Sequence, residues 1–125
     1  MGELIKISCS KCGQVWNSKR GHGKNHAKLE VVIRLFEESV QEQIKQLAEE
    51  DAFVVFDFAY IPVVCKECGM VDSVPVLELL NKKRVFVGMC SRCGKEIPKD
   101  RVKASMRCPV CQAEEMTIER SGFWD

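Results

Sequence analysis

The chain has 125 residues, 46% of them hydrophobic, and a formal net charge of +1. This length allows one domain or two small ones, with a modest core that metal ions could assist. The sequence holds no membrane-length apolar stretch and no secretory hydrophobic run after its first residues, so we expect a cytoplasmic protein without a membrane partner.

Charges are arranged in three blocks along the chain. Residues 6–29 hold six bases and no acid, residues 30–78 hold eleven acids and three bases, and residues 79–108 hold nine bases and two acids. The first block is the better candidate for contact with an anionic partner, because no acid dilutes its charge.

An amphipathic helix is predicted over about residues 27–48, within the acidic block. Acidic residues lie between apolar residues that recur at steps of three and four, namely Leu29, Val32, Ile33, Phe36, Val40, Ile44 and Leu47. We expect this apolar stripe to pack into the core.

Strands are predicted after the helix. Residues 53–61 form a run of aromatic and β-branched residues, which is typical of a central strand under the helix. Residues 71–80 and 84–89 are predicted as two further strands around a polar turn, and residues 116–119 as a closing strand. The pattern indicates a small α+β fold.

Eight cysteines fall into four Cys-x-x-Cys pairs with none left over: Cys9/Cys12, Cys65/Cys68, Cys90/Cys93 and Cys108/Cys111. Two thiolates three positions apart can hold one tetrahedral metal ion from a single turn, so the pairs predict two closed sites with four cysteine ligands each. Glycine follows three of the pairs and proline lies inside the fourth. Both residues favour tight turns, so each pair is predicted to form a turn around the metal, called a knuckle below.

These knuckles resemble those of the zinc-ribbon class, which read Cys-Pro-x-Cys-Gly or close variants. The resemblance covers the four knuckles and their flanking strands, and it implies two structural zinc ions per chain. Iron in a four-cysteine site of the rubredoxin type uses nearly the same ligand geometry and stays an alternative. Disulfides are disfavoured because they need an oxidising compartment, and a redox-active dithiol is disfavoured because it usually occurs once, at the start of a helix.

The pairing of the knuckles is predicted from their spacing. Fourteen residues lie between Cys93 and Cys108, a normal length for a short ribbon, so the third and fourth knuckles are expected to share a metal in a C-terminal zinc ribbon of residues 89–125. The first and second knuckles would then share the other metal in an α+β domain of residues 1–88, with the helix and antiparallel strands inserted. A rival pairing joins the second knuckle to the third and the first to the fourth.

Two histidines, His22 and His26, follow the first knuckle. Only nine residues separate Cys12 from His22, fewer than a finger with two cysteine and two histidine ligands needs. Histidine ligands would also leave Cys65 and Cys68 without a site. We therefore interpret both histidines as exposed polar residues.

A metal ion held by four cysteines has no open position for water or substrate, so we expect neither an enzyme nor a small-molecule substrate. Basic residues beside an aromatic ring suit phosphate contacts and base stacking. The predicted function is RNA or DNA binding, as an accessory factor of transcription or translation, through Trp16, Lys19, Arg20, Lys24, Lys28, Lys99, Arg101 and Lys103. The alternative hypothesis is a protein-interaction adaptor that uses the acidic helix face or the C-terminal Phe123-Trp124.

Overall fold

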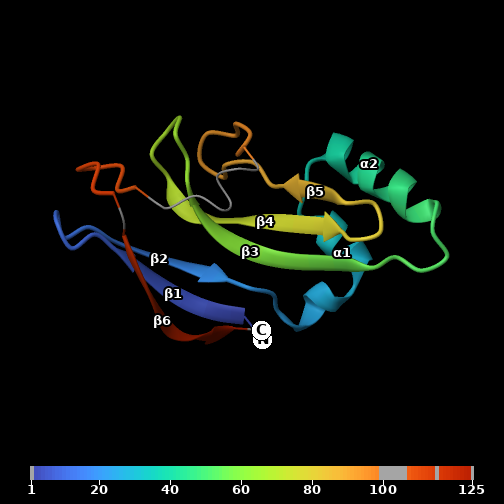
Figure 1. Ribbon diagram of the computed structural model, residues 1–125, viewed down its shortest axis with the longest axis horizontal. Coiled ribbons are helices and arrows are strands. Elements are labelled where there is room, and N and C mark those ends of the chain that lie inside the picture. The colour runs from blue at the N-terminus through green and yellow to red at the C-terminus, as the bar shows by residue number, and fades with distance from the viewer. Residues whose placement is uncertain (1, 99–106, 115, 125) are drawn as a thin grey trace.

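The β-branched segments of this chain form two antiparallel sheets of three strands each, with helices beside one of them (Figure 1). The computed structural model describes residues 2–98, 107–114 and 116–124. In chain order its elements are β1 (Gly2–Ser8), β2 (Val15–Arg20), the 3-10 helix η1 (Lys24–Ala27), α1 (Leu29–Ile33), α2 (Glu38–Glu49), β3 (Phe56–Val64), β4 (Val71–Leu79), β5 (Arg84–Val87) and β6 (Thr117–Trp124).

The first sheet has the strand order β2-β1-β6. Strands β1 and β2 form a hairpin, and β6, from the far end of the sequence, pairs antiparallel with the other edge of β1. The two ends of the described chain therefore lie side by side (Figure 1). This sheet contains strands from both sides of the domain boundary expected after residue 88.

The second sheet has the strand order β3-β4-β5, and β4 is its central strand. The expectation that residues 53–61 form the central strand was therefore wrong. Strand β3 pairs along its whole length with β4, while on its other side Tyr60 exchanges two backbone hydrogen bonds with Gly21, at 2.9 and 2.7 Å. The strand also begins later than expected, at Phe56, and Phe53 stands 84% exposed before it.

The single helix expected over residues 27–48 is two helices, separated by a turn at residues 34–37. The backbone N–H groups of Leu35 and Phe36 donate to carbonyls three residues earlier, at 3.0 and 3.2 Å, which tightens the chain. Glu37 is then extended, with φ −69° and ψ 162°, and α2 starts after it. The turn buries Phe36, which is 5% exposed, in the core.

The larger core lies between the helices and the second sheet. Val32, Ile33, Phe36 and Ile44 pack with buried residues of β3, β4 and β5, and Leu29, Val40 and Leu47 pack against the same cluster. The predicted apolar stripe is thus confirmed as core, although it is divided between two helices. Among the described residues, none of the helices has the length and apolar character that crossing a membrane would require.

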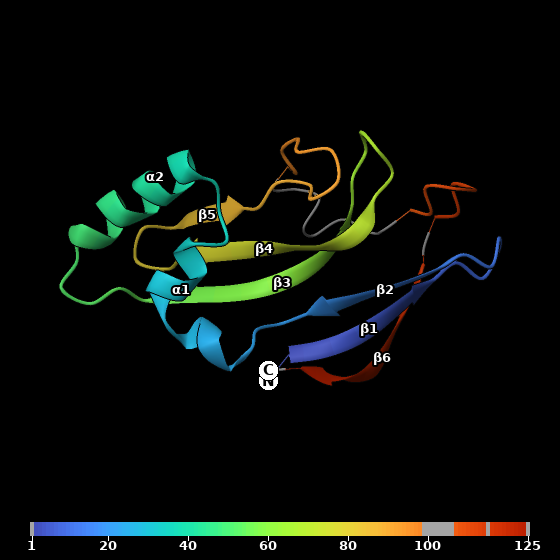
Figure 2. The same cartoon turned by 180° about the vertical axis from the view of Figure 1, so that it is seen from behind.

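A smaller core joins the two sheets. Figure 2 shows both sheets from behind. Ile5 and Ile7 of β1 pack with Val71 of β4, and Trp16 of β2 covers them. Beside this core, the Ser18 hydroxyl donates to the Asp72 carboxylate at 2.5 Å. The first sheet therefore docks on the knuckle end of the β3–β4 hairpin.

Candidate metal centres

All four Cys-x-x-Cys segments form the same turn. In each, the N–H of the first cysteine donates to the carbonyl five residues later, at 2.8 to 3.1 Å, and the N–H four residues later donates back to the first cysteine's carbonyl, at 2.9 Å. The residue after the second cysteine has a positive φ every time: Gly13 (79°), Gly69 (75°), Gly94 (75°) and Gln112 (64°). Glycine meets this requirement without strain in three knuckles, and glutamine meets it at a cost in the fourth.

The variant Gly13→Ala is expected to lower the free energy of unfolding of the metal-loaded protein by about 1 kcal/mol, because alanine disfavours a positive φ. A Cβ at Gly13 would meet no atom within 4 Å, so the loss is conformational and not steric. At the equivalent position, Gln112→Gly is expected to be neutral or stabilising by less than about 1 kcal/mol. Urea denaturation of both variants at equal metal content checks this pair. A neutral Gly13→Ala beside a destabilising Gln112→Gly would contradict it.

The knuckles combine into two groups of four cysteines. Site 1 holds the sulfur atoms of Cys9, Cys12, Cys108 and Cys111, and site 2 holds those of Cys65, Cys68, Cys90 and Cys93; within each site all four sulfurs lie within 4.8 Å of one another. This is the rival pairing, so the expectation that the third and fourth knuckles share a metal was wrong.

Strand pairing, and not spacing in the sequence, decides the combination. The first knuckle is the turn of the β1–β2 hairpin, and the fourth precedes β6, which pairs with β1. The second knuckle is the turn of the β3–β4 hairpin, and the third follows β5, which pairs with β4. Each sheet therefore assembles one site from a hairpin turn and from the end of its third strand.

Sulfur–sulfur distances agree with tetrahedral coordination. The Sγ atoms of Cys9 and Cys111 are 3.5 Å apart, and those of Cys12 and Cys108 are 3.6 Å apart. In site 2 the corresponding distances are 3.7 and 3.6 Å. A tetrahedron with metal–sulfur bonds of about 2.3 Å has edges of about 3.8 Å, whereas a disulfide would need about 2.05 Å. All eight cysteines are free thiols.

The first cysteine of every knuckle is buried. Cys9, Cys65 and Cys90 are each 2% exposed and Cys108 is 0% exposed, so four ligands are held by the protein core. The second cysteines of site 1 lie nearer to solvent. In each site the first cysteines are thus fixed by the core, and the four sulfurs together could hold a metal ion.

In site 1, neighbouring groups lower the pKa of one thiol and raise the pKa of two others. The backbone N–H of Cys12 stabilises the Cys9 thiolate and lowers the pKa of Cys9 to about 6. At Cys12 the N–H of Gln14 acts in the same direction, but desolvation and the Cys108 thiol outweigh it and raise the pKa to about 12. The pKa of Cys111 is also raised, because desolvation and the Cys9 sulfur outweigh the N–H of Ala113.

Site 2 likewise contains thiols with raised pKa values and one thiol with a lowered pKa. Desolvation, reinforced by the Cys90 and Cys65 sulfurs, raises the pKa of Cys68 to about 11. Desolvation also acts on Cys90, but the N–H groups of Cys93 and Arg92 outweigh it and lower its pKa to about 7. One thiol of each site therefore ionises more readily than an ordinary cysteine, and others must release a proton when a metal binds.

The predicted nucleic-acid contacts in the first basic block are largely occupied by other interactions. Trp16 packs on the small core between the sheets, and the Lys19 ammonium lies over the Tyr60 ring. Arg20 forms an ion pair with Glu3, at 2.9 Å. Lys28 is exposed at the N-cap position of α1. The Lys24 side chain, and Lys99, Arg101 and Lys103 entirely, lie outside the described residues.

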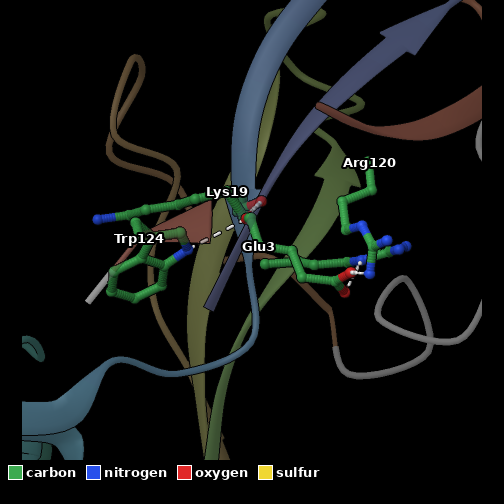
Figure 3. A network of polar contacts seen from close by, with 6 residues as sticks. Glu3, Lys19, Arg120 and Trp124 are labelled. Carbon is green, nitrogen blue, oxygen red and sulfur yellow. Dashed lines mark hydrogen bonds and ion pairs between the residues drawn. The ribbon is translucent and has the colours of Figure 1, made fainter. Parts of the chain in front are cut away.

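Glu3 joins the three strands of the first sheet through its carboxylate. Besides Arg20 of β2, it pairs with Arg120 of β6, at 3.7 Å. Figure 3 shows Glu3 facing Arg120 on one side, with Lys19 and Trp124 on the other. These charges therefore hold the three strands of the first sheet together.

Another set of basic residues belongs to the knuckles themselves. Lys11, Lys66 and Arg92 lie between the two cysteines of the first three knuckles, and Arg107 directly precedes the fourth, and all four are exposed. Lys11, Arg92 and Arg107 belong to the two basic blocks, but none of the four was among the predicted nucleic-acid contacts. The signal that could have found them is their place within or next to each Cys-x-x-Cys motif.

The two histidines differ. His22 is exposed as expected. His26 is half-buried, and its Nδ1 accepts a hydrogen bond from the Gly23 N–H at 2.8 Å, so the expectation of an exposed residue was wrong for His26.

The two C-terminal aromatic residues, Phe123 and Trp124, also differ in their surroundings. Trp124 folds back and donates its indole N–H to the Glu3 carbonyl at 3.1 Å, whereas Phe123 remains 55% exposed.

Compared with known protein families, with curated proteins and with solved structures, the chain gives no match. The geometry of the two cysteine sites is consistent with zinc-ribbon-like metal centres.

Proposed function

We propose that the protein is a non-enzymatic zinc protein that binds nucleic acid through its knuckles. The zinc assignment is supported by the four-thiolate composition of both sites and by sulfur spacings close to those of a tetrahedron. Closed sites of four cysteines are the usual structural zinc sites of proteins, and zinc brings no redox chemistry to them. Each ion would fasten a hairpin turn to a third strand.

The single observation that supports nucleic-acid binding is the exposed base in or beside every knuckle, at Lys11, Lys66, Arg92 and Arg107. The first, second and fourth knuckles lie at the end of the molecule away from α1 and α2, whereas the third lies nearer to α2 (Figure 1). This separates Lys11, Lys66 and Arg107 from the acidic face of α2. One carboxylate beside these bases, that of Glu67, is paired with Lys95 at 3.3 Å.

The second and fourth knuckles also touch each other. A Cβ built on Gly69 would lie 3.5 Å from the Cβ of Pro109. This contact brings the surfaces of sites 1 and 2 together. A backbone with a phosphate at every nucleotide could therefore contact bases from both sites at once.

A competing role for these bases is charge compensation, because a zinc ion with four thiolates carries two negative charges. The two roles differ in what their removal changes. Loss of compensation would weaken zinc binding, whereas loss of phosphate contacts would leave the zinc in place and weaken nucleic-acid binding.

The test compares two double variants of equal charge change, measured by elemental analysis and by binding to generic single- and double-stranded RNA and DNA over a range of salt. Lys11→Gln/Arg92→Gln removes one knuckle base from each site. Arg34→Gln/Lys45→Gln removes one lysine and one arginine from the helical side and serves as the control, since both residues are exposed there. The wild-type protein is expected to hold two zinc ions and to bind with an affinity that falls steeply as salt rises.

The knuckle variant is expected to keep both zinc ions and to lower the slope of log affinity against log salt by nearly one for each base removed. The helix variant is expected to match the wild type. Two outcomes would contradict the proposal: wild-type protein with two zinc ions and no salt-dependent binding, or a knuckle variant that loses zinc instead of affinity.

A protein-binding role is the second candidate, and the exposure of Phe123 favours it. This ring is 55% exposed at the end of β6, with the Arg120 guanidinium 4.8 Å from its centroid. Exposed aromatic and arginine side chains are common anchors of protein interfaces. Absence of nucleic-acid binding in the wild-type protein would favour this role.

A further inference from the structure

Three aromatic side chains meet where the first sheet approaches β3. The ring centroids of His26, Tyr60 and Trp124 lie 5.6 to 5.7 Å from one another, and the three ring planes make angles of 65° to 78°. The rings therefore stand nearly perpendicular to each other, like the walls of a corner. All three are partly exposed.

A cation of the chain already occupies this corner. The Nζ atom of Lys19 lies 4.1 Å from the centroid of Tyr60 and 5.0 Å from that of Trp124. Both distances are within the range of a cation–π interaction. Figure 3 shows the Lys19 side chain extended alongside Trp124.

Each of the three rings is held in place without help from Lys19. Trp124 donates its indole N–H to the Glu3 carbonyl, and it lies so close over Gly2 that a Cβ there would be 2.2 Å from the ring. The Tyr60 ring packs edge to face against Phe58, with the ring centroids 5.4 Å apart. His26 is fixed by the hydrogen bond from the Gly23 N–H. The corner is thus organised before a ligand arrives, which reduces the entropic cost of binding.

The electrostatics of the site favour a positively charged ligand. The face of each aromatic ring carries a negative partial charge. Burial, Lys19 and His22 together lower the pKa of His26, so its ring is neutral at neutral pH and does not repel a cation.

We propose that His26, Tyr60 and Trp124 form a binding site for a methylated ammonium group, and that Lys19 is its internal competitor. The primary ammonium of lysine is strongly hydrated and flexible, and at an exposed site its cation–π interaction is weak. A trimethylammonium group sheds water more readily and presents methyl groups to several rings at once. It therefore displaces Lys19, whether it comes from a free quaternary amine or from a trimethylated lysine of another protein.

The test uses the full-length, metal-loaded protein and follows the two indole N–H signals by NMR while choline is added. Trp124 lies in the site, and Trp16, in the same sheet but outside the site, is an internal control. A second titration uses the neutral isostere of choline, in which a tert-butyl group replaces the trimethylammonium group. Choline is expected to shift the Trp124 signal and not the Trp16 signal, and the isostere is expected to bind more weakly.

Lys19→Gln is the decisive variant, because this exposed side chain can be changed without removing a wall of the site. It is expected to bind choline about two- to fivefold more tightly than the wild type, which is the strength of an exposed cation–π contact. Lys6→Gln, an exposed change on the neighbouring strand β1, is expected to bind like the wild type. Trp124→Leu is expected to lose binding, with zinc content and Trp16 emission as checks on the fold of the first sheet.

Three results would overturn the proposal: equal affinity for choline and its isostere, no gain in affinity for Lys19→Gln, or equal shifts of both indole signals. A trimethyl-lysine peptide then identifies the source of the ligand. Tighter binding of the peptide than of choline supports a modified protein as the source, and equal binding supports a free amine. The knuckle bases take no part in this site, so its failure and that of the proposed nucleic-acid binding are distinguishable.

Discussion

The variant Cys108→Ser is expected to bind one zinc ion instead of two and to lose the sheet β2-β1-β6 while it keeps the helices on the sheet β3-β4-β5. The first sheet rests on a cluster with three buried residues, Ile5, Ile7 and Val71, whereas the second has a cluster with eight. Binding of a structural zinc ion supplies on the order of 10 kcal/mol. The cluster of three buried residues cannot replace that much stabilising free energy, so the first sheet is lost.

The two tryptophans make this outcome measurable. Trp16 and Trp124 are the only tryptophans of the chain, and both lie in the first sheet. Their emission is expected to shift to longer wavelength in Cys108→Ser, while the helical circular dichroism signal of α2 persists. Cys93→Ser, which removes a ligand of site 2, is the reciprocal control and is expected to keep more of the native emission. Native tryptophan emission in Cys108→Ser with only one zinc bound would contradict the prediction.

Chain connectivity reinforces this order of loss. Cys12 and Cys108 are 96 residues apart in the sequence, whereas Cys68 and Cys90 are 22 apart. Closing the longer loop costs roughly 1 kcal/mol more in chain entropy. In a chelator titration of the wild-type protein, zinc is therefore expected to leave site 1 first, and the tryptophan emission should change before the helix signal.

Zinc affinity is expected to fall at least about 100-fold when the pH falls from 8 to 7. The pKa of Cys12 is raised to about 12 and that of Cys111 is raised as well, so both are protonated in this range and each must release a proton to bind zinc. Site 2 has the same property at Cys68, with a pKa of about 11, and at Cys93, whose pKa is also raised. Protons and zinc compete for the same sulfurs, so acidification weakens binding and, with it, the fold.

Competition with a chelator of known pH dependence measures this slope. Below pH 6 the slope at site 1 is expected to steepen, because the Cys9 thiolate, with a pKa of about 6, then takes up a proton too. Calorimetry in two buffers of different ionisation enthalpy gives the number of protons released and serves as an independent control. An affinity that does not change between pH 8 and pH 7 would show that the thiols ionise before zinc arrives.

The cysteines of the two candidate metal sites and the core stripe could be identified from the sequence alone. The four Cys-x-x-Cys segments close their turns through hydrogen bonds between residues at most five apart, so the turns could be predicted from the motifs themselves. The apolar spacing from Leu29 to Leu47 likewise identifies the buried face without knowledge of its partners. The break at Phe36 escaped prediction, because a helical stripe continues through a tight turn when the turn keeps the same face buried.

Which knuckles come together to form each candidate metal site depends on the tertiary structure alone. Spacing favoured the third and fourth knuckles, but the pairing of β6 with β1 carries the fourth knuckle to the first. The tertiary structure also decided which contacts the basic residues make. Lys19 lies over the Tyr60 ring, whereas its sequence neighbour Arg20 pairs with the Glu3 carboxylate. Local motifs are specified by local geometry, whereas strand partners depend on contacts between residues far apart in the chain, which no spacing within the sequence records.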